Sequence, residues 1–195
     1  MINRHRKLSD QLPVKTPDAF TVEVRQGNLG MTYAEDRCPV LATVGLFTCI
    51  GLAGYDKETR LSFLMHIQPS NDVGRGLKLL GDELEATYPF VRKQFETRII
   101  SSLYREVSNF RELEEALRSK EKYGTVRLKL VDMIEFVLDE RRMEKPGEGV
   151  AIDSNTGYLF TYLKETSDSF VPPGMPHHNR PLPEKERWAD GTKKY

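Results

Sequence analysis

The sequence is poor in cysteine and has no excess of charge of either sign. Among its 195 residues there are two cysteines, Cys38 and Cys49, and 29 basic residues balance 29 acidic residues. So few cysteines exclude the disulfide framework of a small secreted domain. A net charge of zero provides no overall positive field that would attract nucleic acid or an anionic membrane surface. We therefore expect a cytoplasmic protein with reduced thiols that does not bind nucleic acid.

A long hydrophobic run is also absent. Residues 40–53 form the longest apolar stretch, and threonine and glycine residues interrupt it. A membrane-spanning helix needs about 20 apolar residues, so we expect no membrane insertion. The first residues are charged and no apolar segment follows them, which argues against a secretory signal. Export without such a signal, as for a secreted effector, stays open.

Proline and charge distinguish the two ends of the chain from its middle. Residues 1–19 mix charge with two prolines and show no sustained hydrophobic period, which predicts a flexible N-terminal arm. Residues 166–195 are rich in proline and almost without apolar periodicity, which predicts an extended C-terminal tail. One folded domain is therefore expected over residues 20–165, a length that suits a single compact core.

Alternation of apolar and polar residues predicts the β-strands. The expected strands cover residues 20–25, 29–33, 40–44, 49–55, 61–67, 96–102, 126–131, 134–138, 149–153 and 158–163. Residues 153–157, Asp-Ser-Asn-Thr-Gly, are expected to form the turn between the last two.

Two segments instead show the 3.6-residue period of amphipathic helices. We expect helices over 75–88 and 110–122, the second with a capping box from Asn109 and Glu112 and a stop at Gly124. Strands, a helix, a strand, a helix and further strands then follow in order. This order predicts an α+β sandwich in which helices pack on a largely antiparallel or mixed sheet.

Two apolar segments in this order carry the residues that suggest chemistry. Thr43 and Cys49 lie in the first segment, His66 lies in the second, and the polar connection 55–60 between them is typical of a hairpin. The hairpin would make the Cys49 and His66 segments neighbours in one sheet. A thiol nucleophile, an imidazole base and a hydroxyl that orients the imidazole form the minimum set for acyl transfer through a thioester.

The motifs around these residues resemble a known signature. The run Thr-Val-Gly-Leu-Phe-Thr-Cys at residues 43–49 and the run His-Ile-Gln-Pro-Ser at residues 66–70 look like those of the CheD family of bacterial chemoreceptor glutamine deamidases. In that family, the motif Thr-x-Gly-x-Gly-Ser-Cys precedes a strand, and a His-x-x-Leu-Pro segment follows that strand. Phe47 replaces the second glycine of the family motif. The fold and the Cys-His pair also resemble those of bacterial toxin domains that deamidate host glutamines.

The resemblance implies a protein-glutamine deamidase, a hydrolase that acts on a linear amide and needs no cofactor or metal. Cys49 would be the nucleophile, His66 the base and acid, and Thr43 the residue that orients the imidazole. Amide groups of Cys49 and of Thr48 or Phe47 would bind the oxyanion. A thiolate paired with imidazolium would have a lowered pKa. The partner would be a protein that carries the target glutamine, in chemotaxis or in the host of a bacterial effector or toxin, and we expect a monomer.

Other interpretations stay open from the sequence alone. The chain fits a catalytically inactive CheD-like binding module of a signalling or chemotaxis protein, with Phe47 closing the approach to Cys49. A single cysteine in an apolar strand is more often a small buried hydrophobic residue, and Cys38 is expected to be a surface thiol in a loop. His177, His178, Glu184 and Glu186 contain metal-binding groups, but a proline-rich tail offers no rigid second shell.

Overall fold

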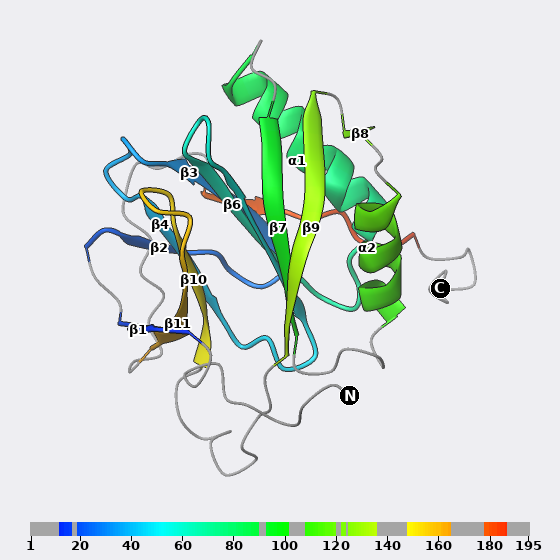
Figure 1. The fold of residues 1–195 in the computed structure, drawn as a ribbon. Helices are drawn as coiled ribbons and strands as arrows, with labels where there is room; N and C mark the ends of the chain where they lie inside the picture. Colours follow the sequence, from blue (N-terminus) through cyan, green and yellow to red (C-terminus); the bar gives the residue numbers. More distant parts are fainter. Residues whose placement is uncertain are drawn as a thin grey trace.

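In the computed structural model, the described residues form two β-sheets and two helices (Figure 1). The structure describes residues 12–16, 19–89, 93–101, 108–119, 122–123, 125–135, 148–164 and 178–186. Both sheets contain parallel and antiparallel pairs. The predicted α+β class, with helices on a mixed sheet, is therefore confirmed.

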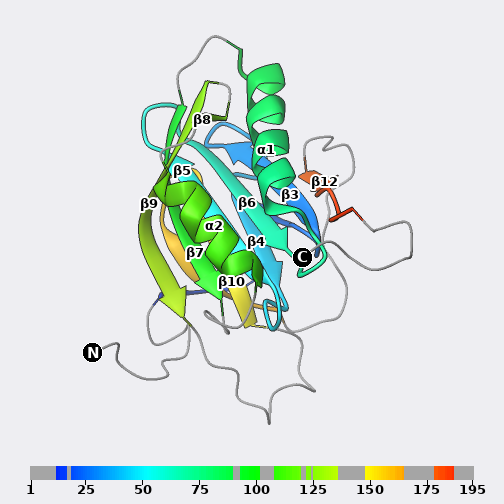
Figure 2. The ribbon, with the colours of Figure 1, turned by 90° about the vertical axis from the view of Figure 1, so that its right-hand side faces the viewer.

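The strand order defines the two sheets. The five-stranded sheet runs β1 (Val14–Lys15), β11 (Leu159–Leu163), β10 (Glu148–Asp153), β4 (Val40–Val44) and β2 (Thr21–Glu23). The seven-stranded sheet runs β12 (His178–Pro181), β3 (Asn28–Tyr33), β6 (Leu61–Ile67), β5 (Ile50–Asp56), β7 (Lys93–Ser101), β9 (Val126–Glu135) and β8 (Lys122–Tyr123). The helices are α1 (Val73–Thr87) and α2 (Ser108–Arg118), which lie on the same side of the seven-stranded sheet (Figure 2).

Strands β5 and β6 lie at the centre of the molecule because both of their faces are covered. Every residue of β6 is buried, which requires the almost continuous apolar sequence of Leu61–Ile67. Alternate side chains point to two different cores: Leu52 and Phe63 pack with the helices, whereas Ala53 and Leu64 pack against the five-stranded sheet. Cys49 packs in the core between the two sheets.

The predicted hairpin joins β5 and β6 as expected. The two strands are antiparallel, with Gly51 opposite His66 and Tyr55 opposite Ser62. The turn predicted over residues 153–157 is also present, because the amide of Gly157 donates to the carbonyl of Asp153 at 2.7 Å. The pairing of the Cys49 and His66 segments in one sheet is therefore confirmed.

One strand replaces the two that the sequence predicted over residues 126–131 and 134–138. Strand β9 is continuous over Val126–Glu135, and its register against β7 shifts between Thr97 and Arg98. The bulge changes which face the alternate residues cover. Leu128 packs in the core beneath the helices, whereas Ile134 packs between the sheets. Residues 136–138 lie outside the described residues.

The described parts of both chain ends belong to the sheets. Val14–Lys15 pairs with β11 and His178–Pro181 pairs with β3, and Leu182 is buried in the helix-side core. Strand β1 therefore lies inside the predicted flexible arm of residues 1–19, and β12 lies inside the predicted extended tail of residues 166–195, so the folded part is not confined to residues 20–165. Their prolines misled the prediction, because proline is tolerated in short strands at a sheet edge.

Helix α2 differs from its prediction at both ends. It begins at Ser108 and ends at Arg118, before the glycine expected to stop it, and Gly124 lies outside the described residues. Asn109 lies within the first turn of the helix rather than before it. Its buried side chain donates to the carbonyl oxygens of Gln68 at 2.7 Å and Asn71 at 3.2 Å. These long-range hydrogen bonds replace the local capping bond that the pattern suggested.

The first helix follows its pattern more closely. Asp72 is its N-cap and accepts a hydrogen bond from the amide of Arg75 at 2.9 Å. A carboxylate in this place satisfies an otherwise unpaired amide of the first turn. Neither α1 nor α2, the helices of the described residues, has the length and apolar character needed to cross a bilayer.

Candidate functional site

Backbone pairing brings the three predicted site residues to one layer of the molecule. Gly51 lies directly opposite His66, and Cys49 precedes Gly51 by two residues, so the thiol and the imidazole are on the same face of the sheet. Thr43 comes from β4 in the facing five-stranded sheet. The candidate site is therefore built across the interface between the two sheets.

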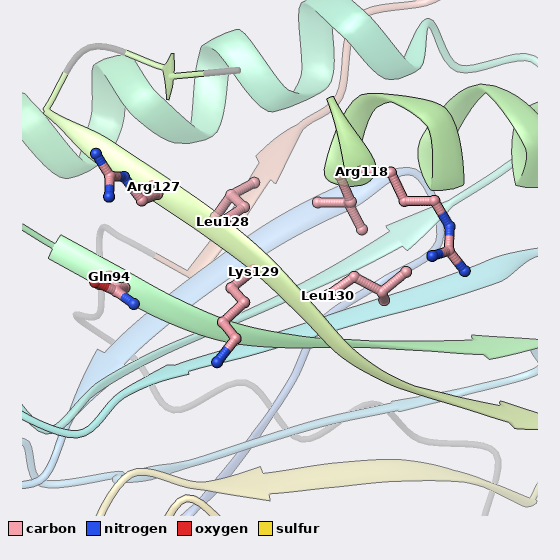
Figure 3. A pocket seen from close by; sticks show the side chains of 7 residues that line it. Gln94, Arg118, Arg127, Leu128, Lys129 and Leu130 are labelled. Carbon is pink, nitrogen blue, oxygen red and sulfur yellow. The ribbon is translucent and has the colours of Figure 1, made fainter. Parts of the chain in front are cut away.

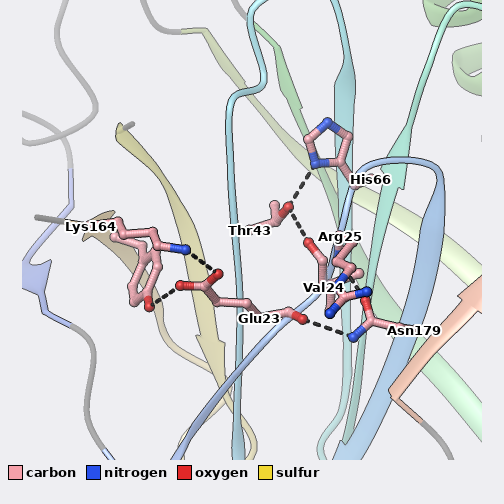
Figure 4. Close-up of polar contacts among 8 residues, drawn as sticks. Glu23, Val24, Arg25, Thr43, His66, Lys164 and Asn179 are labelled. Carbon is pink, nitrogen blue, oxygen red and sulfur yellow. Dashed lines mark hydrogen bonds and ion pairs between the residues drawn. The ribbon is translucent and has the colours of Figure 1, made fainter. Parts of the chain in front are cut away.

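Thr43 and His66 form the central contact of this site. The Thr43 Oγ1 atom is 2.7 Å from His66 Nδ1 and donates a hydrogen bond to the Val24 carbonyl at 2.7 Å (Figure 4). A carbonyl only accepts hydrogen bonds, so the hydroxyl proton is committed to Val24. Thr43 must then accept from Nδ1–H, which leaves the lone pair of Nε2 free. The hydroxyl thus selects the imidazole tautomer in which Nε2 is the base.

His66 is neutral in this environment. Its side chain has no exposed surface, and its Nε2 atom has no hydrogen-bond partner among the residues that the structure describes. Burial lowers the pKa of His66 from 6.5 to about 4, because the charged imidazolium loses its hydration. At neutral pH the ring is therefore in the form that accepts a proton.

Cys49 is a neutral thiol in the same structure. It is 5% exposed, and burial raises its pKa above the ordinary thiol value, although a hydrogen bond with the Thr48 side chain opposes this effect. No hydrogen bond between Cys49 and His66 occurs within the described part of the chain. The expected thiolate–imidazolium pair is therefore wrong for this conformation, because neither charge is solvated between the packed sheets.

The loop before Cys49 packs against Gly51, the cross-strand neighbour of His66. Leu46 is fully buried, and a side chain at Gly51 would bring its Cβ to 3.1 Å from Leu46 Cδ1. Leu46 therefore fills the space in front of Gly51, the residue opposite His66. Gly45 begins this loop with a φ of 75°, a backbone conformation that glycine adopts without strain.

The predicted oxyanion donors follow Leu46 in the same loop. Phe47 is half-buried and packs against Gly45, Thr48 is exposed, and Cys49 leads into β5. A Cβ atom added to Gly45 would lie 3.9 Å from Phe47 Cε2, so the phenylalanine ring packs against this glycine. The role of these three amide groups in oxyanion binding stays a prediction.

A separate pocket of about 590 Å³ lies between the end of α2 and strands β7 and β9 (Figure 3). Its walls combine leucines with three basic side chains. The lining residues are Gln94, Leu117, Arg118, Arg127, Leu128, Lys129 and Leu130. Thr43, Cys49 and His66 do not line this pocket, so it is not the entrance to the candidate site.

The remaining candidate residues do not form a site in the described residues. Glu186 forms an ion pair with Arg75 at 3.7 Å, and Glu184 pairs with Asn71 through a single β-bridge. His177 and the side chain of His178 lie outside the described residues. Within that described portion, no group of three or more His, Cys, Asp or Glu residues is arranged to hold a metal ion.

Cys38 is buried rather than exposed as the sequence suggested. It has no exposed surface, and its thiol donates to the Ala19 carbonyl at 3.5 Å. Both cysteines are free thiols. Cys38 therefore provides an internal reference for the reactivity of Cys49.

Val24 is the site residue that sequence reasoning missed. It contributes its main-chain carbonyl, and no property of its side chain points to that role. The pairing of β2 with β4 brings this carbonyl to Thr43.

No protein-family model and no curated protein sequence matches the chain. The residues of the site themselves are therefore the basis for its chemistry.

Proposed function

We propose that this protein is a cysteine-dependent amidohydrolase that converts a glutamine side chain of a protein substrate to glutamate and ammonia. The observation that carries the proposal is the unpaired Nε2 of His66, held in its basic tautomer by Thr43 on the face that also bears Cys49. A buried polar atom without a partner costs about 1–3 kcal/mol. Four serine and threonine hydroxyls of the described residues are also buried without a partner, but His66 Nε2 is the atom among these five that can act as a base near neutral pH.

The proposed reaction starts from the neutral thiol and imidazole. As Cys49 Sγ attacks the carboxamide carbon, its proton passes to His66 Nε2, and the oxygen of the amide becomes an oxyanion. The Thr43 hydroxyl accepts from Nδ1–H throughout and keeps the ring aligned. Amide groups of Cys49 and of Thr48 or Phe47 bind the oxyanion, and one such donor typically lowers the barrier by about 3 kcal/mol.

The second half of the reaction reverses the proton transfer. Collapse of the tetrahedral intermediate breaks the carbon–nitrogen bond, and the imidazolium of His66 protonates the departing ammonia. Neutral His66 then takes a proton from water, which attacks the thioester carbon. Glutamate leaves and the Cys49 thiol is restored.

Access to His66 requires movement of the loop that holds Leu46. The glycine at position 51 leaves a narrow space opposite the imidazole, and Leu46 fills that space in the closed conformation. In the proposed reaction the glutamine side chain takes the place of Leu46. Gly45 provides the backbone freedom for this exchange, and the displaced Leu46 exposes Cys49 to the substrate.

The CheD-like motif supports the choice of amide. Its Thr, Cys and His positions correspond to Thr43, Cys49 and His66, and enzymes of that family act on protein glutamines. A substrate in bacterial chemotaxis, or a host protein for a bacterial effector, follows from this resemblance.

Deamidation in a cell lysate tests the proposal. Wild-type protein should produce glutamate in place of glutamine at particular sites, detected by mass spectrometry, and Cys49→Ser should produce none. Cys38→Ser is the matched control, because it changes the other buried cysteine and should retain activity. Equal glutamate formation by wild type and Cys49→Ser would contradict the proposal.

A second candidate function is a CheD-like interaction module without turnover. It is favoured by the closed state of the site, in which His66 has no exposed surface and Cys49 has a raised pKa. A module would bind its partner equally well before and after the Cys49→Ser substitution. The lysate experiment therefore distinguishes the two functions, since only the enzyme changes the mass of its partner.

A further inference from the structure

The C-terminal strand β12 reaches the candidate site from a distant part of the sequence. It pairs with β3 at the edge of the seven-stranded sheet (Figure 2). Its register shifts between His178 and Arg180, so Asn179 has no partner residue on β3. A bulge of this kind re-aims a side chain. The bulge in β12 allows the side-chain amide of Asn179 to form hydrogen bonds outside the pair of β3 and β12.

Asn179 uses both ends of its side-chain amide on the segment around Val24. Its Oδ1 accepts from the backbone amide of Arg25 at 2.7 Å, and its Nδ2 donates to the carbonyl of Glu23 at 3.0 Å. These two backbone groups flank Val24, whose carbonyl accepts the Thr43 hydroxyl (Figure 4). The φ of Asn179 is 77°, a left-handed conformation that asparagine adopts more readily than most residues.

The same segment reaches His66 by a second route. The backbone amide of Leu182 donates to the Gly27 carbonyl at 2.7 Å, and the Gly27 amide donates to the carbonyl of His66 at 2.9 Å. One route thus ends at the His66 ring through Val24 and Thr43, and the other ends at its backbone. Leu182 is buried, and its packing holds the segment that carries Asn179 in place.

We propose that Asn179 is a positioning residue for the candidate site, which aligns the Val24 carbonyl so that Thr43 holds His66 with Nε2 as the base. Its catalytic consequence rests on the proposed function. The hydroxyl of Thr43 has one proton, and the position of the Val24 carbonyl decides where that proton points. Without this acceptor, Thr43 can donate to Nδ1 instead, and the ring proton then moves to Nε2, which can no longer accept from Cys49.

Asn179→Gly tests the proposal, because glycine keeps the left-handed backbone and removes both hydrogen bonds of the amide. The readout is the nitrogen chemical shifts of the His66 ring, which distinguish the two tautomers and do not depend on turnover. We expect the Nδ1–H tautomer in the wild type and a mixture in the variant. Labelling of Cys49 should slow on the order of tenfold, as expected when a residue that orients a reacting group is displaced.

Arg180→Ala is the matched control, since it lies on the same strand and loses only a partly exposed ion pair with Glu83. It should retain the wild-type tautomer and labelling rate. An unchanged tautomer in Asn179→Gly would overturn the proposal. If that variant does not fold, Asn179→Asp repeats the test, because it keeps the acceptor for Arg25 and loses the donor to Glu23; a wild-type tautomer there would also overturn it.

The tautomer measurement separates this inference from the proposed function. A shifted tautomer in Asn179→Gly, together with no deamidation by the wild type in a lysate, would support the positioning role and overturn the deamidase. Deamidation by the wild type with an unshifted tautomer in the variant would support the deamidase and overturn the role of Asn179.

Discussion

Two buried polar clusters lie close together in this protein and differ in how completely their atoms are paired (Figure 4). In the first, Glu23 accepts from the Tyr162 hydroxyl at 3.0 Å and from Lys164 Nζ at 2.7 Å. Each of the three side chains therefore has a hydrogen-bond partner, and the two charges compensate each other. In the second, Thr43 pairs with one nitrogen of His66, and the other nitrogen has no hydrogen-bond partner in the described part of the chain. Residues 23–25 connect the two clusters.

The difference separates a structural role from a chemical one. A buried ion pair whose two charges compensate each other has a structural explanation. An imidazole with one nitrogen fixed and the other free keeps one lone pair available to a thiol or a substrate. Burial alone does not distinguish the clusters, since Glu23, Lys164, Thr43 and His66 are all buried. The distinguishing property is the one unpaired atom.

Removal of Lys164 should have the largest effect on stability. Lys164→Met leaves the Glu23 carboxylate buried without its cation, and loss of one member of a buried pair typically costs about 3–5 kcal/mol. The side chains of both partners are 5% exposed, so solvent does not compensate. Urea denaturation followed by circular dichroism measures the change. Glu23→Gln combined with Lys164→Met should recover part of the loss, and a Lys164→Met variant as stable as wild type would contradict the structural role.

Titration of His66 should make stability depend on pH. Its pKa is lowered from 6.5 to about 4 in the folded protein, so below pH 6.5 the unfolded chain binds a proton that the native protein does not. The free energy of unfolding is therefore greatest above 6.5 and decreases as the pH falls toward 4, by roughly 3 kcal/mol from this residue.

Comparison with His66→Gln isolates this contribution. The difference in unfolding free energy between wild type and variant should decrease across the window from pH 6.5 to about 4, because carboxylates titrate alike in both proteins. A constant difference through that window would show that the ring is not buried in neutral form.

Removal of the Thr43 hydroxyl should have a smaller effect on stability and a marked effect on the tautomer of the His66 imidazole. Thr43→Val leaves the Val24 carbonyl and His66 Nδ1 without their partner, at a cost of about 1–3 kcal/mol. The ring nitrogen shifts should report loss of the single tautomer. Thr43→Ser keeps a hydroxyl and should restore both quantities toward wild type; equal behaviour of the valine and serine variants would contradict the account.

The sequence predicted local features well where a repeating pattern carried them. The apolar run of residues 61–67 and the polar connection before it indicated the central hairpin, and the structure pairs Gly51 with His66 there. The contact of Thr43 with His66 followed from a motif rather than from periodicity. The ionisation of the pair was predicted wrongly, because burial between two sheets depends on the tertiary structure and not on the spacing of the residues.

Features carried by the backbone or by distant segments escaped the sequence. The role of Val24 depends on its carbonyl, which every residue has. Asn179 lies in a proline-rich segment that looked like a tail, and a register shift directs its amide. Asn109 matched a local capping pattern but bonds to a distant loop. In each case a long-range contact determined the outcome.

The coupling of Cys49 to His66 is the claim on which the account depends, and the pH dependence of thiol labelling tests it most directly. A pyridyl disulfide, which reacts with thiols in acid as well as at neutral pH, labels Cys49 and Cys38 in the same sample. We predict faster labelling of Cys49, with an advantage that disappears as the pH falls through about 4, where His66 becomes protonated, and that is absent in His66→Ala. Labelling of Cys49 that is unchanged by His66→Ala across this range would contradict the account.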